Sequence, residues 1–212
     1  DASMSLAYSL LAKICEWELL QFTTEDSKKT LKDMLSYAKK AEELDSKNPI
    51  AAYNIARHYF FSGKFEQAKF YSERAIQLNP SYPDAQNILG QSLVHSGKFA
   101  ESEKHFHKAI ELNPLDPNAI LYKDGLYFAQ MGLGNYEMAY LLIEECISQF
   151  SKAGFYKGFK AAVLGYLDKK TEAKDALEEY LSLRPNLKTK EDYKRIFVPN
   201  SSLADILIEG LC

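Results

Sequence analysis

The chain of 212 residues is 46% hydrophobic and 26% charged, so it is long enough to bury a sizeable core in one domain or one array of repeats. Its formal net charge of −3 argues against a surface for duplex nucleic acid, which would need a strongly basic face. No apolar run reaches the length of a membrane span, and Lys13, Glu16 and Glu18 interrupt the apolar residues that a signal peptide would need, so we expect a soluble, folded chain.

The first part of the chain predicts an elongated pair of helices. Residues 5–22 carry apolar side chains at helical spacing, and residues 24–44 read as the partner helix. The connection is longer than in the repeats that follow, so either the helices extend past the usual turn or residues 21–29 form a loop. Thr23, with Asp26 three residues on, is a helix start signal there. One apolar stripe of the first helix consists of Leu6, Leu10, Ile14 and Trp17.

The next part repeats itself at a fixed period of thirty-four residues, which indicates a repeat architecture. In each copy, apolar residues three and four apart on both sides of a Gly-Lys-Phe turn predict two amphipathic helices. Small residues recur where the helices must approach each other, with Ala56 and Gly90 in the first helices. Asn-Pro ends each second helix, because proline lacks an amide and disfavours helical geometry in the residue before it. The matching residues are Gly63-Lys64-Phe65 and Gly97-Lys98-Phe99, Ala68 and Ser102, Ala75 and Ala109, and Asn79-Pro80 and Asn113-Pro114.

Two further helix pairs and a tail follow. The turn at Gly134 comes thirty-seven residues after the turn at Gly97, so we expect a short insertion between Gly125 and Gly134 that lengthens this turn. The last pair is degenerate, because Tyr180 replaces the usual alanine and Lys170 the turn aromatic. The tail predicts two short helices, about 190–197 and 202–210, that cover the exposed apolar edge of the last pair. The predicted units are residues 1–48, 49–82, 83–116, 117–153, 154–187 and 188–212.

These repeats resemble the tetratricopeptide repeat, whose small-residue, aromatic and terminal proline signature they match at most places. They depart from it at the leading tryptophan, which is Ala52 in one copy and Gln86 in the other. The resemblance implies an all-α, right-handed superhelix (a TPR solenoid) with C-terminal capping helices. The stretch from Glu172 to Leu211 also resembles the C-terminal tetratricopeptide region of bacterial multidomain regulators, and this resemblance runs from the opening Asp1-Ala2 to the end of the chain. In those proteins the region follows a class III adenylate or guanylate cyclase domain or a winged-helix transcriptional activator domain, so the resemblance implies such a domain upstream.

Candidate catalytic and metal-binding groups are few. Gly132 and Gly134 follow no predicted strand and precede no Lys-Ser pair, so a turn explains them better than a phosphate loop. His105 and His107 are two apart and point in different directions on a helix, and no third ligand follows at helical spacing. The sequence shows no nucleophile motif and no carboxylate pair in a predicted cleft. We therefore expect no enzyme activity, no metal and no cofactor in this chain.

In stacked two-helix repeats the first helices line the concave side, so their outward-facing residues form a groove. Aromatic rings, one arginine and side-chain amides there suit an extended peptide, because amides bond its backbone and rings pack its side chains. The alternative is that Tyr53 and Phe60 pack against the neighbouring repeat. Asn54 and Arg57 match only in part the tetratricopeptide clamps that hold a C-terminal carboxylate. The predicted groove residues are Lys13, Trp17, Tyr53, Asn54, Arg57, Phe60, Asn87, Gln91, His95, Tyr122 and Gln130.

The sequence thus predicts a non-catalytic protein-protein interaction module, the sensory or scaffolding region of a bacterial signalling protein. Its partner would be a protein, a peptide or its own upstream domain. The alternative is a self-association module that forms a homodimer and so pairs an attached catalytic or DNA-binding domain. Cys15 and Cys146 lie at helix-core positions that favour buried free thiols over disulfide or metal ligands, and the lack of paired cysteines favours a cytoplasmic location.

Overall fold

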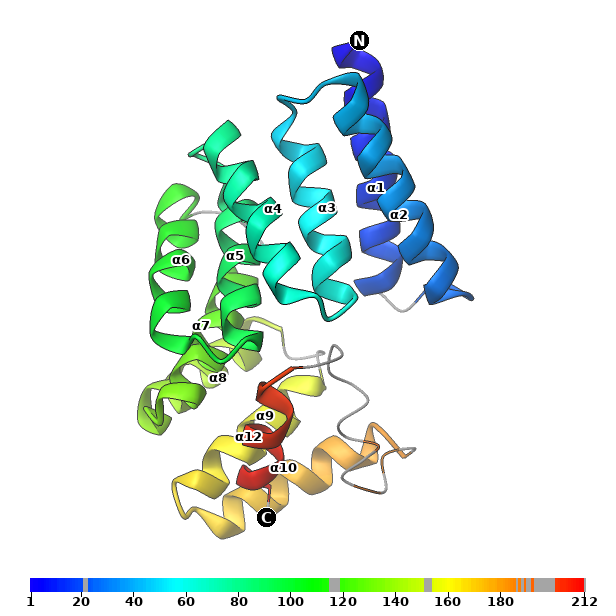
Figure 1. Ribbon diagram of the computed structural model, residues 1–212. Helices are drawn as coiled ribbons and strands as arrows, with labels where there is room; N and C mark the ends of the chain where they lie inside the picture. Colours follow the sequence, from blue (N-terminus) through cyan, green and yellow to red (C-terminus); the bar gives the residue numbers. More distant parts are fainter. Residues whose placement is uncertain are drawn as a thin grey trace. The chain divides into compact units, whose positions relative to one another are not determined.

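The computed structural model describes residues 1–20, 23–114, 119–150, 154–185, 187, 189, 192 and 201–211. Every regular element within these residues is a helix, which confirms the predicted all-α class (Figure 1). The chain divides into two compact units, residues 1–92 and 93–212, and the boundary falls within α5. Among the described helices, none is both long enough and apolar enough to cross a membrane.

Unit 1 holds two helix pairs and the first part of a third. α1 packs along α2, and α3 packs along α4, while both α1 and α2 contact α3 (Figure 1). Asp26 caps α2 by accepting hydrogen bonds from the amides of Lys28 and Lys29, and Asn48 caps α3 in the same way. The start signal of α2 is thus Asp26 itself. The helices are α1 Ala2–Leu20, α2 Ser27–Leu44, α3 Pro49–Phe61, α4 Phe65–Leu78 and α5 Pro83–His95.

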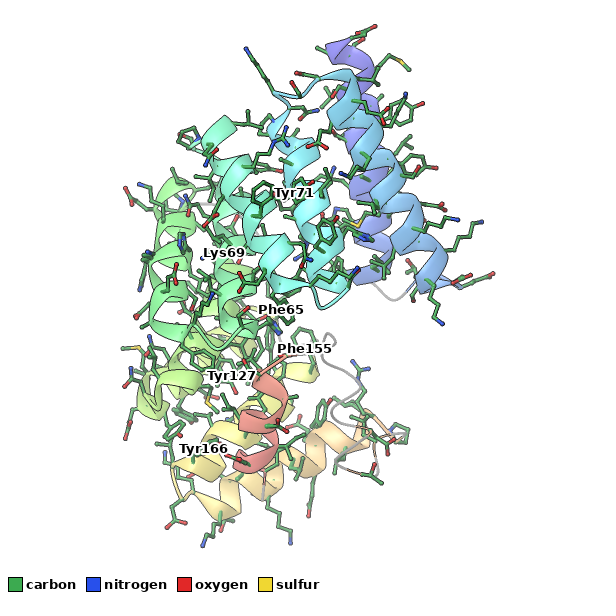
Figure 2. The ribbon with its side chains drawn as sticks, in the orientation of Figure 1. Phe65, Lys69, Tyr71, Tyr127, Phe155 and Tyr166 are labelled. Atoms are coloured by element: carbon green, nitrogen blue, oxygen red, sulfur yellow. The ribbon has the colours of Figure 1, made fainter. Side chains whose placement is uncertain are left out.

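Unit 2 contains the end of α5 and the remaining described helices. α7 pairs with α8 and α9 with α10, while α6 packs on α7 and α8 packs on α9. Its core joins Tyr127, Ile143, Phe159 and Leu207, and Tyr127, labelled in Figure 2, donates a hydrogen bond of 2.8 Å to the carbonyl of Phe159. The helices are α6 Phe99–Leu112, α7 Ile120–Leu133, α8 Tyr136–Gln149, α9 Phe155–Tyr166, α10 Lys170–Ser182 and α12 Leu203–Gly210.

The same tight turn joins the two helices of the last four pairs. Each turn holds one residue with left-handed backbone, a conformation that a side chain disfavours, which explains why three of the four are glycines. The backbone amide of the next residue donates a hydrogen bond to the carbonyl five residues before it. In the first of these turns the Lys64 amide bonds the Tyr59 carbonyl over 2.9 Å. The left-handed residues are Gly63, Gly97, Gly134 and Asp168, with φ of 67°, 77°, 76° and 56°.

The prediction of a longer turn between Gly125 and Gly134 is wrong. α7 runs without interruption through Gly125 and Gly132 to Leu133, and the turn at Gly134 has the common geometry. The extra residues precede α7, since seven residues separate α6 from α7 and only four separate α4 from α5. The two glycines serve helix crossings, because a Cβ at Gly125 or Gly132 would collide with the ring of Phe106 or Phe99 respectively.

The buried face of α1 differs from the apolar stripe seen in its sequence. The residues of α1 that turn inward are mostly small or polar: Ser5, Ser9, Ala12, Cys15 and Glu16. Ser5 donates a hydrogen bond of 2.8 Å to the carbonyl of Ala41 in α2, and the Asn48 side chain bonds both Ser5 and Ser9. Small side chains allow this close approach, which leaves the stripe of Leu6, Leu10, Ile14 and Trp17 between 46% and 55% exposed.

The predicted C-terminal helix is present as α12, whereas the expected helix at 190–197 lies outside the described residues except for Asp192. α12 packs on the last helix pair through α9 and extends onto α7. A Cβ at Gly165 of α9 would collide with the carbonyl of Gly210, so the two backbones touch. Tyr166, labelled in Figure 2, donates a hydrogen bond of 2.8 Å to the carbonyl of Ile206. α12 therefore packs on α9 and α7, the first helices of their pairs, which we expected to line an open groove.

Candidate functional site

The first helices of unit 1 meet in a buried polar network. The Tyr53 hydroxyl of α3 donates a hydrogen bond of 2.8 Å to Oε1 of Glu16 in α1. Nε of Arg57 lies 2.6 Å from the same oxygen, and Arg57 Nη1 donates a hydrogen bond of 3.1 Å to Oε1 of Gln91 in α5. These contacts link α1, α3 and α5 through one guanidinium.

Arg57 was expected to be the solvent-facing cation of the groove, but the structure buries it. Burial opposes the charged form, yet the Glu16 carboxylate raises the pKa of Arg57 above its ordinary value. Burial, and then the nearby Glu16 charge, raise the pKa of Tyr53 well above its ordinary value, so the phenol stays a hydrogen-bond donor. Arg57 also lies over the rings of Phe60 and Phe61, with Cζ 4.5 Å from the Phe61 centroid.

The outer edge of this network is partly open to solvent. Lys13 pairs with Asp84 over 3.3 Å, and each side chain is about one third exposed. Gln91 is half-buried, and its Nε2 donates only a long bond of 3.5 Å to Oδ1 of Asn87. The amide nitrogen of Asn87 donates no hydrogen bond within the described part of the chain. We call Asn87 and Gln91 the amide pair.

Other predicted groove residues of unit 1 serve packing or stand apart. The Asn54 amide is fully buried and donates a hydrogen bond of 2.8 Å to the carbonyl of Ser9, which holds α3 against α1. Phe60 is buried against Phe61 and Phe65 of its own repeat, so these contacts pack the ring within residues 49–82 and not against the neighbouring repeat. Trp17 lies outside the network and is 55% exposed.

In unit 2 the predicted groove residues hold the fold together. His95 Nδ1 lies 2.6 Å from the Ser201 hydroxyl just before α12, and burial lowers the pKa of His95 to about 3. Tyr122 is 1% exposed. Gln130 donates a hydrogen bond of 2.9 Å to Glu103 and accepts one of 2.8 Å from Asn135.

The structure thus brings together Lys13, Tyr53, Arg57, Asn87 and Gln91 out of the predicted set. Two carboxylates join them: Glu16, which helical spacing had also turned toward the groove, and Asp84, which the sequence did not indicate. The signal for Glu16 was its place among only three charged residues of a largely apolar helix, three residues from Lys13. Such a charge is stable inside a protein only when it is paired.

A third carboxylate stands out in unit 2. Oδ1 of Asp124 is buried and has no hydrogen-bond partner among the described residues. Burial raises the pKa of Asp124 to about 7, and burial also raises the pKa of its neighbour Cys146, to about 12. Nothing in the sequence marked Asp124, because its environment is set by α8 and α9.

The described residues hold no candidate metal cluster, and the two cavities found among them lie away from the predicted groove residues. Within these residues, no cluster of three or more His, Cys, Asp or Glu side chains could hold a metal ion. A cavity of about 310 Å³ lies beside Phe70 and Arg74, and one of about 360 Å³ lies beside Tyr166 and Glu209. Neither is lined by a predicted groove residue.

Two parts of the chain match family models described as tetratricopeptide repeat, residues 50–82 and residues 83–116. No curated protein matches the chain.

Solved structures of similar fold cover most of the chain at low sequence identity. YrrB, titled a TPR protein with an unusual peptide-binding site, is 20% identical with a TM-score of 0.59 over 88% of each chain. PilW, titled a type IV pilus biogenesis factor, is 16% identical with a TM-score of 0.71 over 96% of this chain and 90% of its own. A tetratricopeptide repeat protein from Parabacteroides merdae is 20% identical with a TM-score of 0.62 over 97% of this chain and 83% of its own. Residues 50–116 are therefore tetratricopeptide repeats, and the chain has the fold of a tetratricopeptide repeat domain.

Proposed function

We propose that the chain is a protein- or peptide-binding module that holds an extended segment against the amide pair of unit 1. One observation carries the proposal: the buried Arg57 donates to Oε1 of Gln91 and so fixes which end of this amide faces out. Nε2 of Gln91, on a half-buried residue, and the amide nitrogen of Asn87, a residue that is 9% exposed, are then left as donors. Two such donors suit the carbonyl oxygens of a peptide backbone.

The network behind the amide pair supports binding through preorganisation. Glu16 holds Arg57, and Arg57 holds Gln91, so the donors are oriented before a ligand arrives. Binding then loses less side-chain entropy than it would with free glutamine rotamers. Lys13 and Asp84 at the same edge offer both signs of charge to flanking side chains of the ligand.

The comparisons support the class of function. YrrB, a protein of this fold, is described as having an unusual peptide-binding site, although the low identity transfers no residue of that site. A chain built from tetratricopeptide repeats is typically a binding module without catalysis, and we propose the same here.

The wider context is also part of the proposal. We place this module at the sensory or scaffolding end of a bacterial signalling protein in the cytoplasm, on the resemblance of residues 172–211 to the tails of such regulators. Sequencing the gene that encodes the chain tests this. Cyclase aspartates or a winged-helix recognition helix upstream would support the context, and a gene without either would overturn it.

The binding proposal is tested with a phage-displayed random peptide library screened on the whole chain. Selected peptides are synthesised and titrated by calorimetry against the parent, Asn87→Ala and Gln91→Ala. We expect each variant to weaken binding by roughly tenfold, the cost of about one lost hydrogen bond. Gln77→Ala is the matched control, because Gln77 is an exposed glutamine on α4. Binding that falls equally with all three variants, or with none, would count against the amide pair.

A further inference from the structure

The outward face of α1 exposes a set of large apolar side chains to solvent. Within α1, all of which the structure describes, Glu18 is the one charged residue that points outward with this face, and Lys13 at its edge already pairs with Asp84. Figure 1 shows α1 at one end of the row of helices in unit 1, where it packs on α2 and α3. We call this face the α1 stripe; its large side chains are Met4, Leu6, Leu10, Leu11, Ile14, Trp17 and Leu20, each 39% to 55% exposed.

The spacing along the stripe is that of a helix-to-helix seam. Ser3, Ala7, Leu10, Ile14 and Trp17 follow one another at intervals of four, three, four and three residues. This is the heptad spacing that keeps one line of side chains facing a partner helix. The stripe is therefore suited to a second helix more than to a loop or a small ligand.

Side-chain size changes along the seam in a way that selects the partner. The first half of the seam is small, Ser3 and Ala7, and the second half is large, Ile14 and Trp17, with Leu10 at the centre. Two identical copies in antiparallel orientation about Leu10 would set Trp17 against Ser3 and Ile14 against Ala7. A parallel pair would instead stack Trp17 on Trp17 and leave a gap between the two serines. The stripe is thus self-complementary in one orientation, as a two-fold interface must be.

The area is sufficient for a dimer. From their exposed fractions, the seven large side chains present on the order of 600 Å² per chain, so complete burial of all of them in two copies would remove about 1,200 Å², the lower end of stable interfaces.

We propose that the α1 stripe is the interface of a two-fold symmetric dimer of this chain, in which two α1 helices pack antiparallel across Leu10. The amide pair lies on α5, so this inference stands or falls independently of the peptide site.

The mass of the whole chain is measured by sedimentation equilibrium over micromolar concentrations. The parent is expected to show the doubled mass, and Ala7→Glu or Ile14→Lys alone is expected to lose it, since each places two charges in the seam. Leu141→Lys is the matched control, because Leu141 is a 62% exposed leucine on α8, and it should keep the parent's mass. Circular dichroism checks that every variant keeps its helices.

The double variant Ala7→Glu with Ile14→Lys tests the orientation. In the antiparallel pair each new carboxylate faces a new ammonium of the other copy, so the doubled mass should return. In a parallel pair like charges would face each other, and the chain would stay single. A monomeric parent would overturn the dimer and assign the stripe to a different polypeptide segment. A dimer that survives Ile14→Lys, or a double variant that stays monomeric, would overturn this interface.

Discussion

Glu16 and Arg57 form an ion pair of 2.6 Å in which both side chains are only 7% exposed. The two residues come from α1 and α3, and the pair joins the elongated N-terminal helices to the first tetratricopeptide repeat. Replacing both members of a buried ion pair by apolar side chains changes the stability little, whereas removing one member leaves an unpaired buried charge and is costly. The pair therefore makes the two helix pairs depend on each other.

Replacement of Arg57 alone should strongly destabilise the chain. We expect Arg57→Met to lower the free energy of unfolding by roughly 3–5 kcal/mol, because it leaves Glu16 charged and buried. The double variant Arg57→Met with Glu16→Gln should recover most of this, since the new amide still accepts the Tyr53 hydrogen bond. Urea unfolding measures both. Lys13→Met, which breaks a partly exposed pair, should cost less than about 1 kcal/mol; equal losses for Arg57→Met and Lys13→Met would contradict the burial argument.

Local sequence signals predicted the helix pairs because the apolar spacing and the Gly-Lys-Phe turn each lie within a short stretch and recur after thirty-four residues. They failed for α1, since a helix that is apolar on nearly every side does not show which face is buried. Ser5 and Ser9 face inward only because α2 and Asn48 supply partners.

The groove prediction failed at Arg57 for a related reason. Spacing placed Arg57 on an outward face with Tyr53, but its burial depends on Glu16 from a distant helix. Gly125 shows the same limit, because a glycine marks a turn and a helix crossing equally well, and only Phe106 of α6 decides between them.

The turn at Asp168 should be improvable. Asp168 adopts φ of 56°, the conformation that Gly63, Gly97 and Gly134 hold in the equivalent turns. We expect Asp168→Gly to raise the free energy of unfolding by roughly 0.5–1 kcal/mol, while Gly63→Ala lowers it by about 1 kcal/mol. Asp168→Asn is the control, because asparagine tolerates this conformation, and it should leave stability nearly unchanged. A less stable Asp168→Gly variant in thermal melting would mean that the aspartate side chain contributes more than its backbone costs.

The attachment of α12 depends on the contact between Gly165 and Gly210. We expect Gly165→Ala to push α12 away from α9, because the new methyl group would collide with the Gly210 carbonyl. Hydrogen exchange should then speed up selectively at residues 203–210. Gly63→Ala is the control, since Gly63 lies in a turn of unit 1, whereas α9 and α12 both belong to unit 2. Equal protection of α12 in the Gly165→Ala variant and the parent would place the anchor elsewhere.

Asp124 should make unit 2 less stable as the pH rises. Burial raises the pKa of Asp124 to about 7, whereas the unfolded carboxyl titrates near about 3.9. Between these values the folded chain binds a proton that the unfolded chain has released, so the free energy of unfolding falls with increasing pH across this window. His95 acts in the opposite sense, since its pKa is lowered to about 3 and its neutral form is favoured by folding.

Asp124→Asn separates the effect of this carboxylate from that of His95, because the variant and the parent both retain the histidine. The variant and the parent should be about equally stable near pH 4, and the variant should become more stable by roughly 2–4 kcal/mol near pH 8, as linkage requires for a shift of this size. Urea unfolding at a series of pH values measures the difference. Asp175→Asn is the matched control, because Asp175 is exposed on α10 and should give no pH-dependent difference. A gap between the Asp124→Asn variant and the parent that stays constant with pH would show that the buried carboxylate does not titrate in this window.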